Sequence, residues 1–63
     1  MTTSATQAYR QRVETIRVQL RLMEEALSKH EVKQAADPKN WGYPGDLTEV
    51  MVHMREALNM LGY

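Results

Sequence analysis

The stretch DPKNWGYPG, residues 37–45, divides this 63-residue chain, because it holds both prolines and two of the three glycines. Glycine and proline mark loops, and residues 4–35 and 46–61 on either side contain neither. The sequence therefore predicts a single all-α domain over residues 1–63, with a long helix at about 4–35, a loop at 37–45 and a shorter helix at about 46–61. We expect the two helices to fold back on each other as a helical hairpin.

The longer predicted helix carries a sustained apolar stripe, called the seam below. Its members alternate spacings of four and three residues, which is the heptad pattern of a coiled coil. A strand fits poorly, because the polar run Arg10-Gln11-Arg12 breaks any alternation with a period of two. The seam residues are Tyr9, Val13, Ile16, Leu20, Met23 and Leu27.

Capping residues predict where the two helices begin and end. Asp46, followed three residues later by Glu49, is a variant of the capping box and predicts the start of the second helix. Gly62 suits the position just after that helix, where a positive φ is needed. A hydroxyl can cap the first helix from Thr2, Thr3 or Ser4.

The unequal helix lengths predict self-association. A helix of about 32 residues is roughly 48 Å long and one of about 15 residues roughly 22 Å, so the shorter helix covers only half of the longer one. The amino-terminal part of the seam, from Tyr9 through Val13 and Ile16 to Leu20, would then remain in water, and a contiguous exposed apolar stripe on a small protein marks an interface. We expect a homodimer in which two hairpins form a four-helix bundle, with the seam as the dimer interface.

Further apolar and aromatic side chains lie off the seam. Trp41 and Tyr43 stand in the predicted loop, where Trp41 can either cover the end of the bundle as a lid or act as a recognition residue. Asn40 before it can form an Asx-type turn. We expect a second protein partner to bind the surface made by Trp41, Tyr43, Val18, Leu22, Val52 and Met60.

Composition excludes several classes of protein. The chain has no cysteine, so neither a disulfide nor a Cys-based zinc site can stabilise it. No apolar run approaches the roughly 20 residues of a membrane span, and the first residues resemble no signal peptide, so we expect a cytoplasmic protein without a membrane partner. Two histidines are too few for a metal site, and no nucleophile motif or phosphate loop is present. We expect no catalytic residues, no cofactor and no metal.

The charges sum to zero but are unevenly distributed. Residues 5–21 have a local charge of +3 and residues 22–37 a local charge of −2, so two antiparallel copies of the long helix would match in sign. The basic half can instead carry ordinary ion pairs within its own helix, such as Arg10–Glu14, Arg17–Glu14 and Arg21–Glu25. A third interpretation is a phosphate-binding face made of Arg10, Arg12, Arg17 and Arg21.

Together these features predict a small non-catalytic protein-interaction or regulatory module that acts as a homodimeric helical bundle. The alternative is an RNA- or DNA-binding helical dimer that uses the arginine face. A phosphate-driven complex weakens steeply with salt, whereas an apolar protein interface does not, so salt separates the two functions.

Overall fold

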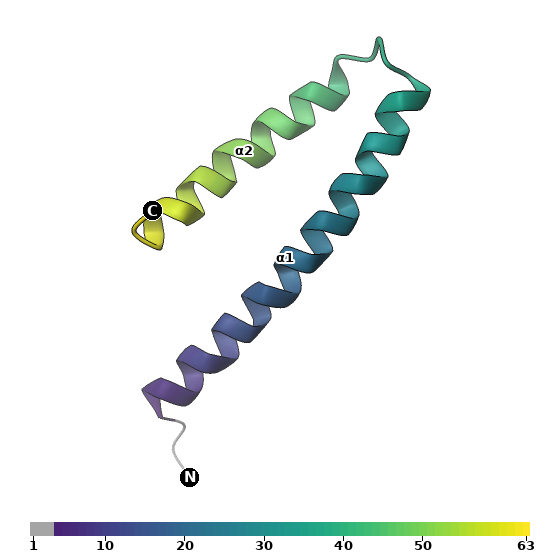
Figure 1. Ribbon diagram of the computed structural model, residues 1–63. Helices are drawn as coiled ribbons and strands as arrows, with labels where there is room; N and C mark the ends of the chain where they lie inside the picture. Colours follow the sequence, from purple (N-terminus) through teal and green to yellow (C-terminus); the bar gives the residue numbers. More distant parts are fainter. Residues whose placement is uncertain (1–3) are drawn as a thin grey trace. The chain divides into compact units, whose positions relative to one another are not determined.

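The computed structural model describes residues 4–63 and contains two α-helices, α1 (Ala5–Ala36) and α2 (Gly42–Met60), joined by a short loop (Figure 1). No strand occurs in the described residues, so the all-α prediction is confirmed. The chain forms two units: one is α1 as far as Val32, and the other runs from Lys33 through the loop and α2 to Tyr63.

The start of α1 is fixed by a reciprocal pair of hydrogen bonds. The backbone N–H of Gln7 donates to the Ser4 hydroxyl at 3.1 Å, and the backbone N–H of Ser4 donates to Gln7 Oε1 at 3.1 Å. This capping box satisfies donors that a first helical turn otherwise leaves unpaired. Ser4 is thus confirmed as a cap, while Thr2 and Thr3 lie outside the described residues. The predicted helix at about 4–35 agrees with α1 to within one residue.

The end of α1 leads into a loop that is shorter than predicted. The loop spans residues 37–41 rather than 37–45, and α2 begins at Gly42 rather than Asp46. The predicted start is wrong because Pro44 and Gly45 belong to the first turn of α2 and not to the loop. Proline is tolerated in a first helical turn, since its missing N–H would have no helical partner there.

Asn40, not Asp46, caps α2. Its side-chain Oδ1 accepts a hydrogen bond from the Gly42 N–H at 2.8 Å, and its Nδ2 donates to Asp37 Oδ2 at 3.1 Å. Trp41 already has helical dihedral angles (φ −69°, ψ −11°), so Asn40 sits where a side-chain cap acts. The predicted Asx-type turn is confirmed, whereas the predicted capping box at Asp46 and Glu49 is wrong because both residues lie inside the helix.

The carboxyl end of α2 closes with the predicted glycine. Gly62 has φ +83°, and its N–H donates to the Asn59 carbonyl at 3.0 Å. The Tyr63 N–H donates to the Leu58 carbonyl at 2.9 Å. These two bonds make a Schellman motif, which satisfies carbonyls that the helix end leaves free and needs a left-handed residue at this position.

Neither helix is buried in this single chain. Among residues 4–63 none is classed as buried, and Ala8, Val13, His30, Tyr43, Leu47 and Leu58 are the half-buried ones. The described chain therefore lacks the hydrophobic core on which a small monomer depends.

Candidate protein-interaction surface

The predicted seam forms one exposed stripe along α1. Residues spaced by three and four positions lie on the same side of a helix, so the α-helical backbone places all six seam residues together. Tyr9 is 70% exposed and Leu20 51% exposed, and Val13 alone of the six is half-buried. Large apolar side chains that are this exposed keep much apolar area in contact with water. Burial of the seam against a second surface would remove that area from water, which is favourable.

A shallow depression lies beside the seam on the same helix. It has a volume of about 440 Å³ and is lined by Gln19, Leu22, Met23 and Ala26. The small Ala26 side chain leaves space there for an incoming side chain. The depression thus joins Leu22, a predicted partner-binding residue, to the seam residue Met23. Val18 is the second predicted partner-binding residue on α1, and it is also exposed.

On α2 the predicted partner-binding residues are separated along the helix. Val52 and Met60 are exposed, Met60 at 90%, whereas Tyr43 is half-buried. Tyr43 belongs to the first turn of α2 and not to a loop as predicted. The prediction also missed Tyr63, which is 86% exposed, and Val32 at the end of the first unit. Neither follows a heptad spacing with the seam, so periodicity did not indicate them.

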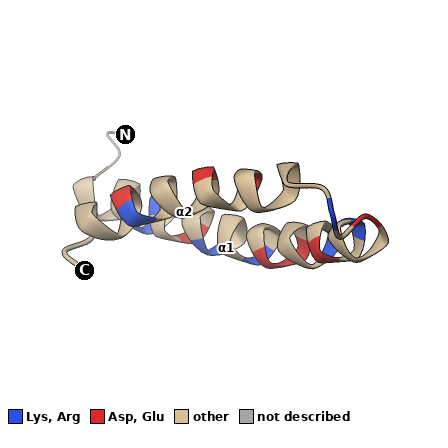
Figure 2. Cartoon of the chain, turned by 90° about the horizontal axis from the view of Figure 1, so that it is seen from above, with Lys and Arg blue, Asp and Glu red and all other residues tan. Residues whose placement is uncertain are grey.

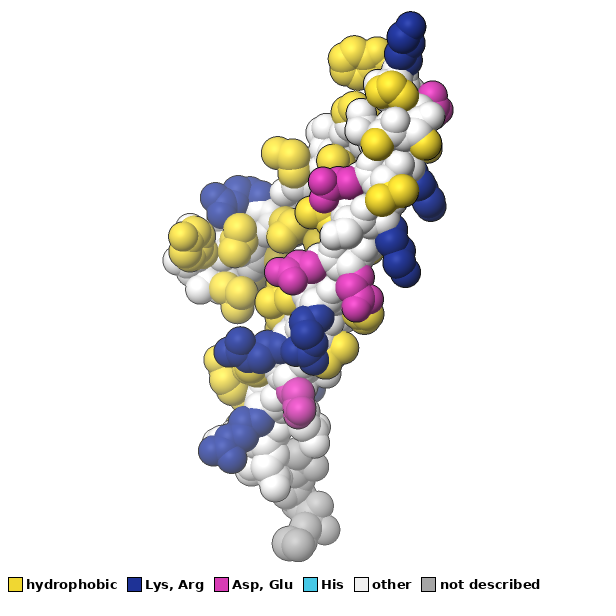
Figure 3. Space-filling view, turned by 45° about the vertical axis from the view of Figure 1, so that its right-hand side comes forward, with side chains coloured by type: hydrophobic (Ala, Val, Ile, Leu, Met, Phe, Trp, Pro, Cys, Tyr) yellow, Lys and Arg dark blue, Asp and Glu magenta, His cyan; other side chains and the backbone are white. Residues whose placement is uncertain are grey.

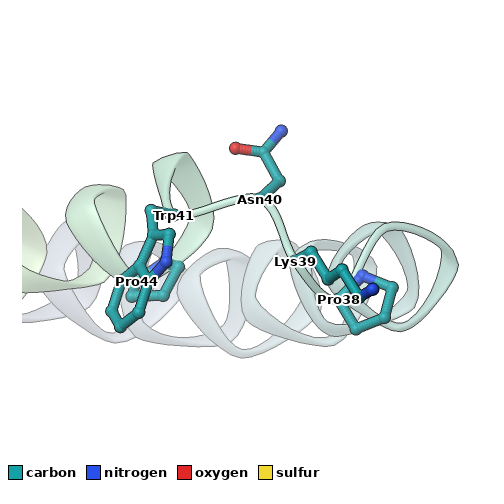
Figure 4. A pocket seen from close by; sticks show the side chains of 5 residues that line it. All are labelled: Pro38, Lys39, Asn40, Trp41 and Pro44. Carbon is teal, nitrogen blue, oxygen red and sulfur yellow. The ribbon is translucent and has the colours of Figure 1, made fainter.

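Trp41 borders an open depression at the start of α2. The depression measures about 450 Å³ and is lined by Pro38, Lys39, Asn40, Trp41 and Pro44. Figure 4 shows the Trp41 indole beside the Pro44 ring, while the Asn40 side chain points away from both. Trp41 is 85% exposed in the single chain.

The four arginines of the predicted phosphate-binding face all lie on α1 and are exposed. Within residues 4–63 none of Arg10, Arg17 and Arg21 forms an ion pair with a carboxylate, so the ion pairs expected within the helix are absent. The i,i+4 spacing permits such pairs, but exposed pairs of this kind contribute little and water competes for both groups. Charged residues are distributed along both helices (Figure 2).

Charge also separates along α1. Figure 3 shows basic side chains gathered toward the amino-terminal end of α1 and acidic side chains along its middle. This matches the local charge of +3 over residues 5–21 and −2 over residues 22–37. The exposed helix therefore has two halves of opposite sign on the same element as the seam.

One pairing of a histidine with a carboxylate lies within α2. His53 Nδ1 lies 3.8 Å from Glu56 Oε2 on α2, a pairing of i,i+3 neighbours. No group of three or more His, Asp or Glu side chains among residues 4–63 is arranged to hold a metal ion. Neither α1 nor α2 is long and apolar enough to cross a bilayer.

No family model matches this chain, and neither a curated protein nor a solved structure is significantly similar to it.

Proposed function

We propose that this protein is a small non-catalytic protein-interaction or regulatory module that acts as a homodimeric helical bundle. One observation carries the proposal: the seam of α1 is exposed on a chain without a buried residue in its described part. A 63-residue chain without cysteine has no disulfide to replace a core, and oligomerisation is the common remaining means of stabilisation.

In the proposed assembly each chain folds back as a helical hairpin, and two hairpins form a four-helix bundle. The seam then supplies the apolar layers between the two copies. Trp41, Val52 and Met60 remain for a second protein, together with the apolar side chains off the seam. Tryptophan is enriched among the residues that dominate binding energy at protein interfaces, which supports Trp41 as the main contact.

Light scattering over a dilution series tests the homodimer. We expect a mass of twice the chain mass of 7.3 kDa, falling to 7.3 kDa only on strong dilution. The dimer should persist at high salt, because apolar burial does not depend on ionic attraction. A chain that stays at 7.3 kDa at every concentration tested contradicts the proposal.

A second candidate function is supported by the unpaired arginines of α1. Arg10, Arg12, Arg17 and Arg21 are exposed and lack a carboxylate partner within the described residues, so they are available to phosphates. Titration of labelled RNA and DNA duplexes tests this function, and binding that is lost with added salt and in R17E/R21E would support it. No binding at low salt would contradict it.

A further inference from the structure

A row of four charged residues runs along one flank of the seam. Each lies at a heptad spacing from the next, and each directly follows a residue of the set Tyr9, Ile16, Met23 and His30. We call these four the charged row: Arg10, Arg17, Glu24 and Glu31. All four are exposed on α1, and none forms an ion pair within the described residues.

The order of signs in the charged row is self-complementary when reversed. Two positive residues precede two negative ones at equal spacing, so a copy that runs in the opposite direction presents the opposite sign at every position. Residues that flank a helix–helix seam are the ones that select partner and orientation in coiled coils. We propose that the seam binds a second copy of this chain with the two α1 helices antiparallel, in the register defined by this row.

That register aligns the apolar residues as well as the charges. It places Leu20 opposite the partner's Met23 and Ile16 opposite the partner's Leu27. Each apolar layer then pairs one residue of the set Val13, Leu20 and Leu27 with one residue of the set Tyr9, Ile16 and Met23, which are the two core positions of the heptad. In the same register Arg17 faces the partner's Glu24 and Arg10 faces the partner's Glu31. Two-fold symmetry doubles these contacts to four ion pairs per dimer.

Other alignments match the charges less well. Shifting the antiparallel helices by one heptad sets Glu24 against the partner's Glu24, or Arg17 against the partner's Arg17, and leaves only two attractive pairs. In a parallel pair, the charged row of one helix meets the residues on the other side of the partner's seam. Arg12 then faces the partner's Arg17, and no attractive contact compensates for this repulsion. The proposed register also brings Arg12 against the partner's Lys33, a like-charged contact that two-fold symmetry doubles to two per dimer, against the four attractive pairs.

This inference rests on the proposed homodimer and adds its orientation and register. It also bears on the nucleic-acid alternative. Once Arg10 and Arg17 pair with carboxylates of the second copy, Arg12 and Arg21 are the arginines of α1 left for phosphates. The two functions therefore compete for the same side chains.

Charge exchange in the full chain tests the proposal by light scattering at low salt. R10E/R17E makes the row entirely acidic and E24R/E31R makes it entirely basic, so each alone should dissociate at a concentration at least about tenfold above that of the wild type. An equimolar mixture of the two variants should restore the dimer.

The quadruple variant R10E/R17E/E24R/E31R keeps the net charge and reverses the row, and it should dimerise as the wild type does. The matched control R21E/K29E changes the net charge as R10E/R17E does but lies away from the seam, and it should remain dimeric.

Orientation is measured independently with a spin label. The chain has no cysteine, so Gln11→Cys, at an exposed position away from the seam, gives one label per copy. The proposed register separates the two labels by roughly 32 Å along the helix axis, whereas parallel helices hold them level. A wild-type monomer at all concentrations overturns both the homodimer and the register. A wild-type dimer that gives the short label distance, or that is unaffected by R10E/R17E, overturns the register and leaves the homodimer standing.

Discussion

Asn40 is the residue on which the start of α2 depends. Its Oδ1 accepts from the Gly42 N–H and its Nδ2 donates to Asp37, so one side chain links the end of the loop to the first helical turn. Asn40→Ala removes both bonds and should lower the free energy of unfolding by about 1 kcal/mol. Thermal unfolding followed by circular dichroism at fixed protein concentration measures this change. The neighbouring Lys39→Ala is the control and should be neutral; an equal loss in both variants would contradict the capping role.

Alanine substitutions at Gly62 and Gly45 should change the stability of the protein in opposite directions. A Cβ at either position meets no atom within 4 Å, so steric crowding does not distinguish them. Gly62 has φ +83°, where an L-residue is strained, and Gly62→Ala should destabilise the protein by roughly 1 kcal/mol. Gly45 lies in the first turn of α2 without a positive φ, and Gly45→Ala should stabilise by about 0.5 kcal/mol or more. Denaturant unfolding of both variants measures the difference, and changes of the same sign would contradict it.

At the scale of the element, α1 begins with the Ser4–Gln7 capping box. Isolated helices are marginal in water, so the first turn depends on its caps more than the middle of the helix does. Ser4→Ala should increase amide hydrogen exchange over residues 5–8, consistent with a local loss of about 1 kcal/mol. Gln11→Ala is the control, because its side chain makes no hydrogen bond and alanine favours helix. Unchanged exchange in the Ser4 variant would show that the box does not hold this turn.

At the scale of the whole molecule, the exposed seam makes stability depend on protein concentration. If two copies bury the seam together, the melting temperature rises with concentration by mass action. Leu20→Lys places a charge in the centre of the seam and should abolish the dimer at concentrations where the wild type is fully paired. Val18→Lys has the same chemistry off the seam and should keep the dimer. Light scattering and melting curves at several concentrations measure both variants, and equal behaviour of the two would contradict a seam-mediated dimer.

Several features of this chain follow from local sequence rules. The absence of glycine and proline over residues 4–35 and the spacing of the apolar residues predicted α1 and its seam, because helical periodicity is a property of neighbouring residues. Gly62 was predicted as the residue after α2 because a left-handed position favours glycine. The order of signs in the charged row is likewise readable from the sequence.

Other features are decided only by the tertiary structure. Pro44 and Gly45 are typical of loops, yet both lie in the first turn of α2, because the Asn40 side chain caps a helix that begins at Gly42, four residues before Asp46. Trp41 stands in the stretch predicted as a loop, but its backbone is already helical and its indole is exposed in the single chain. Burial depends on which surfaces meet in space, and residue spacing carries that information only as far as one helix extends. For that reason the lack of a core became apparent only with the structure.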